Sequence, residues 1–588
     1  MLRGMRVTRG GWSWGAVLLL ACGGQARSGQ VGQPSSGSSG ELRGPDQQTL
    51  RAWDQLVDEY IEQSFVRDPG FAVSQGRHDF DGKVADLSQA GLRRAVEQLT
   101  EQRERASKFA PQELDPVLAF ERAYLLANAE GALFWLTRAE EPARNPLFYS
   151  SAVDPGVYVA RDYAPLDRRL AACVALLRGV PGVLRAMREN LVLPLPRTHV
   201  SVALEVYGGL ISYIERDVQQ VFGASQDAPL KAELSAASAE AVAALREVVA
   251  YFEAQKAQAT DAFALGPELF AEMLWATERV DTPLDRLAEL GDRDLERNLS
   301  ALRSACAELA PGKSLSECAA LVNADKPREG PVAAARRQLV QLRQFVAARE
   351  LVSIPGTEEV LVEEAPPHKR WNQAFIEIPG PYDVSQPSIY YIAPPDPAWT
   401  AAERLAYVPG EADLLFISVH EVWPGHFLQF LHANRAERMF GRLFVGYAFA
   451  EGWAHYSEEL MWEAGMSADP EVHVGQLLNA LLRNVRFVSA IGLHTRGMTV
   501  ADAEQLFREK ALQDPANAKQ QAARGAFDPG YLNYTLGKLI IRKLRDDWTA
   551  PRGGRSAYRA FHDKLLSFGG PPLPLVRDAM LGESSPAL

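Results

Sequence analysis

The chain has 588 residues, of which 47% are hydrophobic and 23% are charged. This composition is ordinary for a globular protein, and the length allows two to four domains. The formal net charge of −12, with no basic stripe along the sequence, argues against nucleic acid as a partner, because phosphate binding needs a positive surface.

The N-terminus is typical of an export signal. Three arginines lie within the first nine residues, and the apolar run 16–21 that follows is too short to span a bilayer. The run ends in Leu-Leu-Ala-Cys, which resembles the lipobox of bacterial lipoproteins, whose cysteine is acylated. We therefore expect residues 1–21 to be a lipoprotein signal peptide and Cys22 to carry the lipid. A plain secretory signal followed by a chance cysteine is the alternative.

The segment after the signal is rich in Gly, Ser and Gln, which is typical of a flexible tether. Residues 22–45 would then join the lipid to the folded part and hold the protein in the bacterial cell envelope, on its periplasmic or surface face. An exported protein meets an oxidising compartment, where disulfides persist. Cys306 and Cys318 are close enough in sequence to form one, although buried free thiols are equally consistent with the sequence.

Residues 46–350 predict helix after helix, because apolar residues recur at helical spacing among many Ala, Leu, Glu and Arg. The predicted helices are Gln48–Gln63, Ala90–Phe109, Val117–Leu136, Leu166–Arg188, Leu204–Phe222, Leu230–Ala257, Leu284–Leu309 and Pro331–Arg349. No fixed-period repeat indicates a solenoid.

The pattern changes between residues 350 and 395. Three β-branched or aromatic runs separated by Pro and Gly predict short strands at Glu358–Glu363, Ala374–Ile378 and Ser388–Ile392. Helical patterns then return almost to the C-terminus. The expected fold is therefore mainly α: a large helical protein with a small β-sheet next to the active-site helix. We divide it into a helical lobe, 46–350, and a catalytic lobe, 351–588.

The strongest chemical signal is the run HEVWPGH at 420–426, which follows an apolar helical segment. Neutral imidazole is a good zinc ligand, and a carboxylate beside a ligand can take a proton from metal-bound water. His420 and His426 are six residues apart, however, and six steps of about 100° do not return to the same face of a regular helix. Pro424 removes a helical N–H and Gly425 permits unusual backbone conformations. We therefore predict a helix distortion that brings His426 back to His420.

A second polar group lies 25 residues further on, in AEGWAHYSEEL. Glu451, His455 and Glu458 share one face of a helix that is otherwise apolar and aromatic. A buried carboxylate needs a partner, and a bound cation would supply one. We choose Glu451 as the third metal ligand, with His455 and Glu458 supporting the ligands through hydrogen bonds.

The sequence resembles a bacterial family over most of its mature length. The paired segments HEVWPGHFLQ at 420–429 and AEGWAHYSEEL at 450–460 carry the resemblance, and DPGFAVSQGRHDFDGKVADLS at 68–88, ALGPELFAEML at 264–274 and DPGYLNYTLGKLIIRKLR at 528–545 support it. The family is catalogued as domain of unknown function 885 and is grouped with gluzincin-type metallopeptidases. The resemblance implies a mostly helical fold around a zincin-like site and one zinc ion per chain. It also implies that His420, His426 and Glu451 hold the metal and that Glu421 is the general base for hydrolysis of peptide-like substrates.

Further side chains are candidates for contact with substrate. Their chemistry suits three tasks. The alternative for the arginines is a structural ion pair, and the alternative for Tyr534 is a packed aromatic ring with one hydrogen bond. His494 and Tyr534 can donate to a developing oxyanion, and Arg483 or Arg486 can bind a substrate carboxylate. Tyr390 and Tyr391 lie in a predicted strand that could bind an extended substrate by main-chain pairing.

These features predict a zinc-dependent hydrolase, and we expect a peptidase that cleaves short peptides by metal-activated water. One alternative is a zinc amidohydrolase that acts on non-peptide or cell-wall substrates. Another is a lipid-anchored binding protein with an inactive site. A serine hydrolase is disfavoured, because the sequence contains no GxSxG elbow.

Overall fold

The computed structural model describes residues 47–366, 370, 373–383, 386–397, 399–582 and 586–588. This part of the chain is mainly helical with one small three-stranded sheet, which confirms the predicted fold class. The predicted signal peptide, the tether and Cys22 lie outside the described residues.

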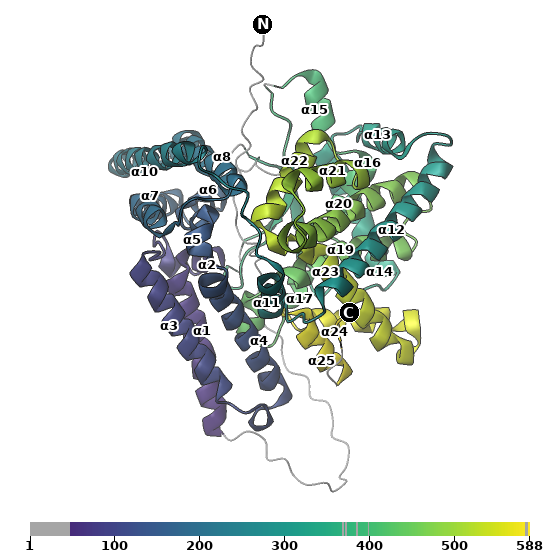
Figure 1. Ribbon diagram of the computed structural model, residues 1–588, viewed down its shortest axis with the longest axis horizontal. Helices are drawn as coiled ribbons and strands as arrows, with labels where there is room; N and C mark the ends of the chain where they lie inside the picture. The colour runs from purple at the N-terminus through teal and green to yellow at the C-terminus, as the bar shows by residue number, and fades with distance from the viewer. Residues whose placement is uncertain (1–46, 367–369, 371–372, 384–385, 398, 583–585) are drawn as a thin grey trace.

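The N-terminal helices form one side of the molecule, drawn in purple and blue in Figure 1. They are α1 (Gln47–Arg67), α2 (Pro69–Ser74), α3 (Gln89–Ser107), α4 (Pro116–Leu133), α5 (Glu141–Arg144), α6 (Gly156–Ala160), α7 (Leu166–Asn190), α8 (Arg197–Tyr213), α9 (Gln219–Phe222) and α10 (Ala228–Gln255). Their apolar faces enclose a core that includes Trp53, Tyr60 and Phe252. Within the described ranges α7 alone is long and apolar enough to cross a membrane, but its apolar residues lie in this core.

The remaining helices form the other side, in teal to yellow. They are α11 (Pro267–Glu278), α12 (Leu284–Leu309), α13 (Leu315–Ala324), α14 (Pro331–Ala348), α15 (Ala401–Tyr407), α16 (Glu411–Glu421), α17 (His426–Ala433), α18 (Met439–Leu443), α19 (Tyr447–Glu463), α20 (Pro470–Thr495), α21 (Val500–Lys510), α22 (Pro515–Phe527), α23 (Asn533–Thr549), α24 (Tyr558–Leu566) and α25 (Leu573–Leu581). Helix α12 packs on α20, and α14 packs on α16. The core around Trp53 draws mainly on residues before 260 and the second core mainly on residues after 269, but Phe440 and Leu443 belong to the first and Phe134 and Ala139 to the second. The division into lobes at residue 350 stays a prediction.

The sheet lies next to α16 and has the strand order β1-β3-β2. Strand β1 (Val360–Glu364) runs parallel to β3 (Ser388–Ile392), and β2 (Ala374–Glu377) runs antiparallel to it. Because β3 is paired on both sides, it has no free edge. The prediction that the strand of Tyr390 and Tyr391 binds substrate by main-chain pairing is therefore wrong, and both tyrosines are buried.

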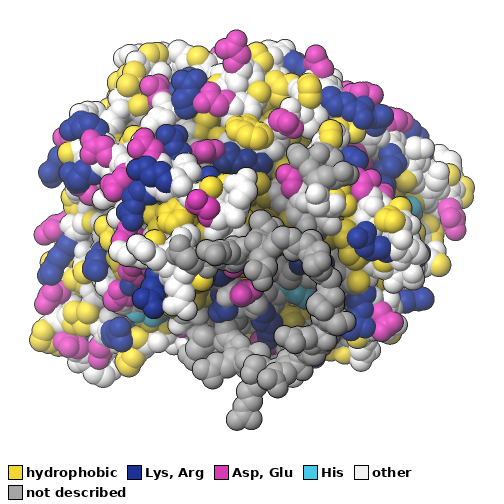
Figure 2. All heavy atoms as spheres, turned by 90° about the horizontal axis from the view of Figure 1, so that it is seen from below, with side chains coloured by type: hydrophobic (Ala, Val, Ile, Leu, Met, Phe, Trp, Pro, Cys, Tyr) yellow, Lys and Arg dark blue, Asp and Glu magenta, His cyan; other side chains and the backbone are white. Residues whose placement is uncertain are grey.

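Two smaller findings complete the fold. Cys306, in α12, and Cys318, in α13, form a disulfide, whereas Cys173 is a buried free thiol. On the face shown in Figure 2, positive and negative side chains are interspersed rather than gathered by sign.

Candidate metal centre

The HEVWPGH motif is the junction of two helices. Helix α16 ends at Glu421 and α17 begins at His426, and the Trp423–Pro424 peptide between them is cis. The Gly425 N–H donates to the carbonyl of Val419 at 3.0 Å. A Cβ atom at position 425 would lie 1.8 Å from the His420 carbonyl oxygen, so only glycine permits this approach. The expected distortion is thus a complete break between two helices.

Helix α19 supplies the third member of the group and is fixed to that break. Trp453 follows Glu451 by two residues on α19, and its indole N–H donates to the Pro424 carbonyl at 2.8 Å. Helix α19 also packs closely against α23. The approach is so close that a Cβ atom on Gly452 would lie 2.5 Å from the Cα of Gly537. The two glycines therefore allow α23 to bring Tyr534 beside the ligand helix.

The break and the helix packing bring His420, His426 and Glu451 together. Oε2 of Glu451 lies 3.2 Å from Nε2 of His420 and 3.5 Å from Nε2 of His426. One ligand atom from each residue lies within 4.8 Å of the other two, and all three side chains are buried. Nδ1 of His426 makes no hydrogen bond within the described part of the chain. The three residues therefore bring three potential metal-ligand atoms together, and their hydrogen-bonding capacity is not fully used by the protein.

This geometry fits a zinc ion. Zinc bonds of about 2.1 Å in a tetrahedral site place neighbouring ligand atoms about 3.4 Å apart. The two Glu451–imidazole distances of 3.2 and 3.5 Å match that spacing. Two imidazoles and a carboxylate are also a common ligand set of catalytic zinc, which keeps its fourth position for water or substrate.

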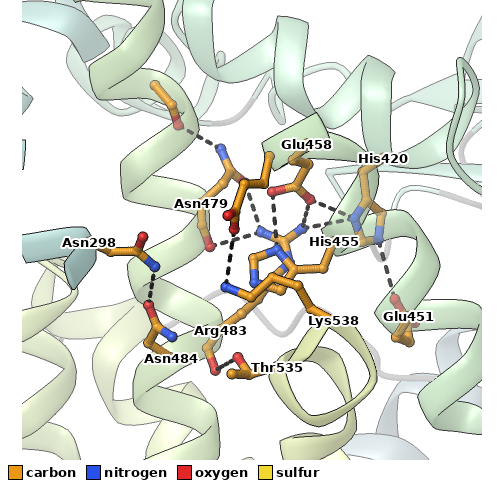
Figure 3. Close-up of polar contacts among 12 residues, drawn as sticks. Asn298, His420, Glu451, His455, Glu458, Asn479, Arg483, Asn484, Thr535 and Lys538 are labelled. Carbon is orange, nitrogen blue, oxygen red and sulfur yellow. Dashed lines mark hydrogen bonds and ion pairs between the residues drawn. The ribbon is translucent and has the colours of Figure 1, made fainter. Parts of the chain in front are cut away.

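His420 is oriented by a second layer of polar side chains (Figure 3). Its Nδ1 lies 2.7 Å from Oε1 of Glu458, which also accepts from Arg483 at 3.0 Å. Nδ1 of His455 lies 3.4 Å from the other oxygen of Glu458. A carboxylate on the far nitrogen fixes the ring orientation and leaves Nε2 directed at the ligand group. Arg483, which the sequence suggested for substrate, is engaged here instead.

The electrostatics of the group favour positive charge between the carboxylates. Burial and Arg483 oppose protonation of His420, but its contacts with Glu451 and Glu458 outweigh them and raise the pKa of His420 to about 9. Although burial opposes ionisation, the contacts with His420 and His426 hold the pKa of Glu451 well below its usual value. The group of three ligands thus stabilises a positive charge, which either a proton or a metal ion can supply.

Glu421 and Tyr534 lie beside the three ligands. Oε2 of Glu421 accepts from the Ile376 N–H of β2 at 3.2 Å, so the sheet orients this carboxylate. The Tyr534 ring stacks on the His420 ring with centroids 6.4 Å apart. Burial and the Glu451 charge raise the pKa of Tyr534, which therefore remains a protonated donor at neutral pH.

His494 occupies a structural position. Its Nε2 lies 2.8 Å from the Gly525 carbonyl, and its Nδ1 accepts from the Leu265 N–H at 3.3 Å. Both ring nitrogens are therefore engaged by backbone, and burial lowers the pKa of His494 to about 4. The expectation that His494 donates to substrate does not agree with these contacts.

Two residues beside the site were not foreseen. Trp453 joins α19 to the break, and Arg524 of α22 lies with its guanidinium carbon 6.0 Å from the centre of the Tyr534 ring. The tryptophan lies inside the EGWA motif, so its proximity to Glu451 was the available signal. Arg524 had no such signal, because its place depends on the packing of α22 against α20.

Comparisons with known proteins place the chain in a family. The family described as bacterial protein of unknown function (DUF885) matches residues 69–580. The chain belongs to this family. No curated protein matches it.

Two solved structures share its fold. A candidate lipoprotein of unknown function from Shewanella oneidensis has a TM-score of 0.76 at 23% identity. A candidate lipoprotein from Colwellia psychrerythraea has a TM-score of 0.77 at 17% identity. Each alignment covers 90% of this chain and 99% of the other. The likeness therefore extends through both sides of the molecule.

Proposed function

We propose that this DUF885 protein is a zinc-dependent hydrolase that cleaves short peptides. The observation that carries the proposal is the convergence of His420, His426 and Glu451, with Glu421 directly following the first ligand. The resemblance to gluzincin-type metallopeptidases supports the same assignment. We further propose that the protein is anchored in the cell envelope by a lipid on Cys22, as the lipobox-like sequence and the descriptions of the two structural neighbours suggest.

The chemistry is divided among the side chains of the site. A zinc ion held by the three ligands would lower the pKa of a bound water to about 7 and polarise the scissile carbonyl. Glu421, held by the Ile376 N–H through Oε2, accepts the proton of the attacking water and passes it to the leaving amine. Tyr534 donates its phenolic hydrogen to the developing oxyanion. Glu458 and Arg483 keep His420 in the orientation that binding requires.

The direct test measures metal content and cleavage together. Protein purified without added metal should contain about one zinc per chain, and it should digest a library of short peptides. A chelator should stop the digestion and added zinc should restore it. A protein without metal, or one with equal activity in chelator, contradicts the proposal. Stoichiometric zinc with cleavage only of cell-wall or non-peptide amides would instead support the amidohydrolase alternative.

A pair of variants tests the ligand assignment. His426→Ala should lose the zinc because one of three ligands is removed. His432→Ala, on the same helix α17, is the matched control, because His432 contacts the Ser353 carbonyl rather than the ligand group. Unchanged zinc content in His426→Ala contradicts the assignment.

A further inference from the structure

Three arginines gather around the Tyr534 ring beside the proposed metal site. The guanidinium carbons of Arg483, Arg486 and Arg524 lie 5.8, 4.8 and 6.0 Å from the ring centre. Arg483 and Arg486 are buried, one helical turn apart on α20. Buried guanidinium groups normally have acidic partners, so the partner of each arginine identifies its role.

Two of the three positive charges are compensated. Arg483 pairs with Glu458 at 3.0 Å, and Arg524 pairs with Asp528 at 3.0 Å. Arg486 is different: its Nε donates to the neutral amide oxygen of Gln521 at 2.8 Å. Among the described residues no carboxylate lies within 4.0 Å of Arg486, although only 8% of this residue is exposed.

The environment of Arg486 is unfavourable for its own charge. Burial, and then the neighbouring charge of Arg524, lowers the pKa of the Arg486 guanidinium below its usual value. A positive charge that is desolvated, repelled and without an acidic partner destabilises the folded chain. Such a group is typical of a site that receives a negative charge from a ligand.

The Tyr534 ring connects Arg486 to the proposed metal ligands. The Tyr534 ring packs against Arg486 on one side, and its centre lies 6.4 Å from the ring centre of His420. The preceding arginine on the same helix face, Arg483, has a nitrogen 3.2 Å from Nδ1 of His420. The Tyr534 hydroxyl forms no hydrogen bond to the part of the chain that the structure describes. A phenol and a guanidinium with spare donors therefore stand side by side next to the ligand group.

We propose that Arg486 binds a carboxylate of the substrate, so that the enzyme prefers short peptides whose free C-terminal carboxylate lies close to the scissile bond. This inference rests on the proposed function and names its substrate class. A planar guanidinium can bind both oxygens of a carboxylate, and the buried setting strengthens that contact. Bound carboxylate would supply the acidic partner that Arg486 lacks.

Pairs of tripeptides that end in a carboxylate or in a carboxamide test the proposal by hydrolysis. The wild-type protein should cleave the acids with kcat/KM about 100-fold above the amides, because loss of one partner of a buried charge pair has an effect of this size. Arg486→Gln should lower kcat/KM for the acids about 100-fold more than for the amides, so that the preference for acids disappears. Arg486→Lys should lie between the two. Arg496→Gln, at the exposed end of the same helix, is the control and should change neither.

A binding measurement separates this inference from the proposed function. In Glu421→Gln protein, which is expected to be inactive, the acids should raise the melting temperature and the amides should not. The added substitution Arg486→Gln should abolish that difference. Acid-specific stabilisation without any peptide cleavage would contradict the proposed function and keep the carboxylate site. Equal cleavage or equal stabilisation by acids and amides overturns the carboxylate site, and absence of both responses overturns both proposals.

The melting temperature of Arg486→Gln tests whether Arg486 has only a structural role. Without peptide, Arg486→Gln should melt at or above the wild-type temperature, because a buried uncompensated charge has been removed. A clearly lower melting temperature, together with unchanged preference for acids, would overturn the proposal and assign Arg486 to packing on Tyr534.

Discussion

Two buried polar groups meet at helix α19 and are built in opposite ways. We call His420, His426 and Glu451 the ligand group. The second, which we call the ionic cluster, consists of Asp294, Arg297, Glu459, Asn484, Lys538 and Arg542 (Figure 3 shows part of it). In the ionic cluster every charge has an opposite partner: Lys538 lies 2.5 Å from Asp294 and 3.6 Å from Glu459. In the ligand group Nδ1 of His426 has no hydrogen-bond partner among the residues that the structure describes.

The two groups differ in how completely their charged and polar atoms are paired, and not in how deeply they are buried. Lys538 is fully buried, and Asp294, at 5% exposed, is buried nearly as deeply as Glu451, at 3%. Charges that satisfy one another hold helices in one arrangement, whereas converging donor atoms without full pairing are available to a ligand. Neighbouring glutamates on α19 are divided in this way, since Glu458 faces His420 and Glu459 faces Lys538. The comparison predicts that substitutions in the two groups affect different properties.

The largest expected effect is on turnover. Glu421→Gln keeps the size and the Ile376 contact of the side chain but removes the base, so kcat should fall about 1000-fold while the zinc content and the melting temperature stay near the wild-type values. Turnover on a cleaved peptide and metal content by mass spectrometry check both parts. Glu253→Gln, at an exposed position on α10, is the control. Full activity of Glu421→Gln would contradict the general-base assignment and the catalytic role that we propose beside the ligand group.

The second prediction concerns stability. Lys538→Met should lower the free energy of unfolding by about 3 kcal/mol, because it leaves the buried carboxylates of Asp294 and Glu459 with fewer partners. Urea unfolding measures the change, and the zinc content per folded chain should not fall. Lys543→Met removes a half-exposed pair with Asp547 on the same helix and should cost less than about 1 kcal/mol. Loss of zinc from Lys538→Met without loss of stability would show that the two groups are not separate in function.

The sequence predicted the parts of this comparison that depend on local pattern. The helices, the three strands and the need for a break at Pro424-Gly425 all follow from spacing and backbone chemistry. The pairing of charges did not, because Asp294 and Lys538 are 244 residues apart and meet only through the packing of α12, α20 and α23. The same limit explains the misplaced roles of Arg483 and His494. Each lies on a polar face, but the partner of each comes from a distant segment.

The smallest effect separates structural histidines from the ligand group by their response to acid. His562 is fully buried, with Nε2 2.8 Å from the Tyr456 hydroxyl and Nδ1 2.6 Å from the Leu351 carbonyl. Burial lowers the pKa of His562 to about 4, below the ordinary value of 6.5. Between these values the unfolded chain binds a proton that the folded chain does not, so the free energy of unfolding falls as the pH falls.

The contribution of His562 should be about 2 kcal/mol between pH 7 and pH 5, since each pH unit below 6.5 corresponds to about 1.4 kcal/mol for one group. Urea unfolding of chelator-treated protein at the two pH values measures it. His562→Gln should be less stable at pH 7, because it loses a buried hydrogen bond, but its stability should fall by about 2 kcal/mol less on going to pH 5. An unchanged pH dependence in this variant would mean that His562 is protonated in the folded protein, and that full hydrogen bonding does not distinguish structural histidines from the ligand group.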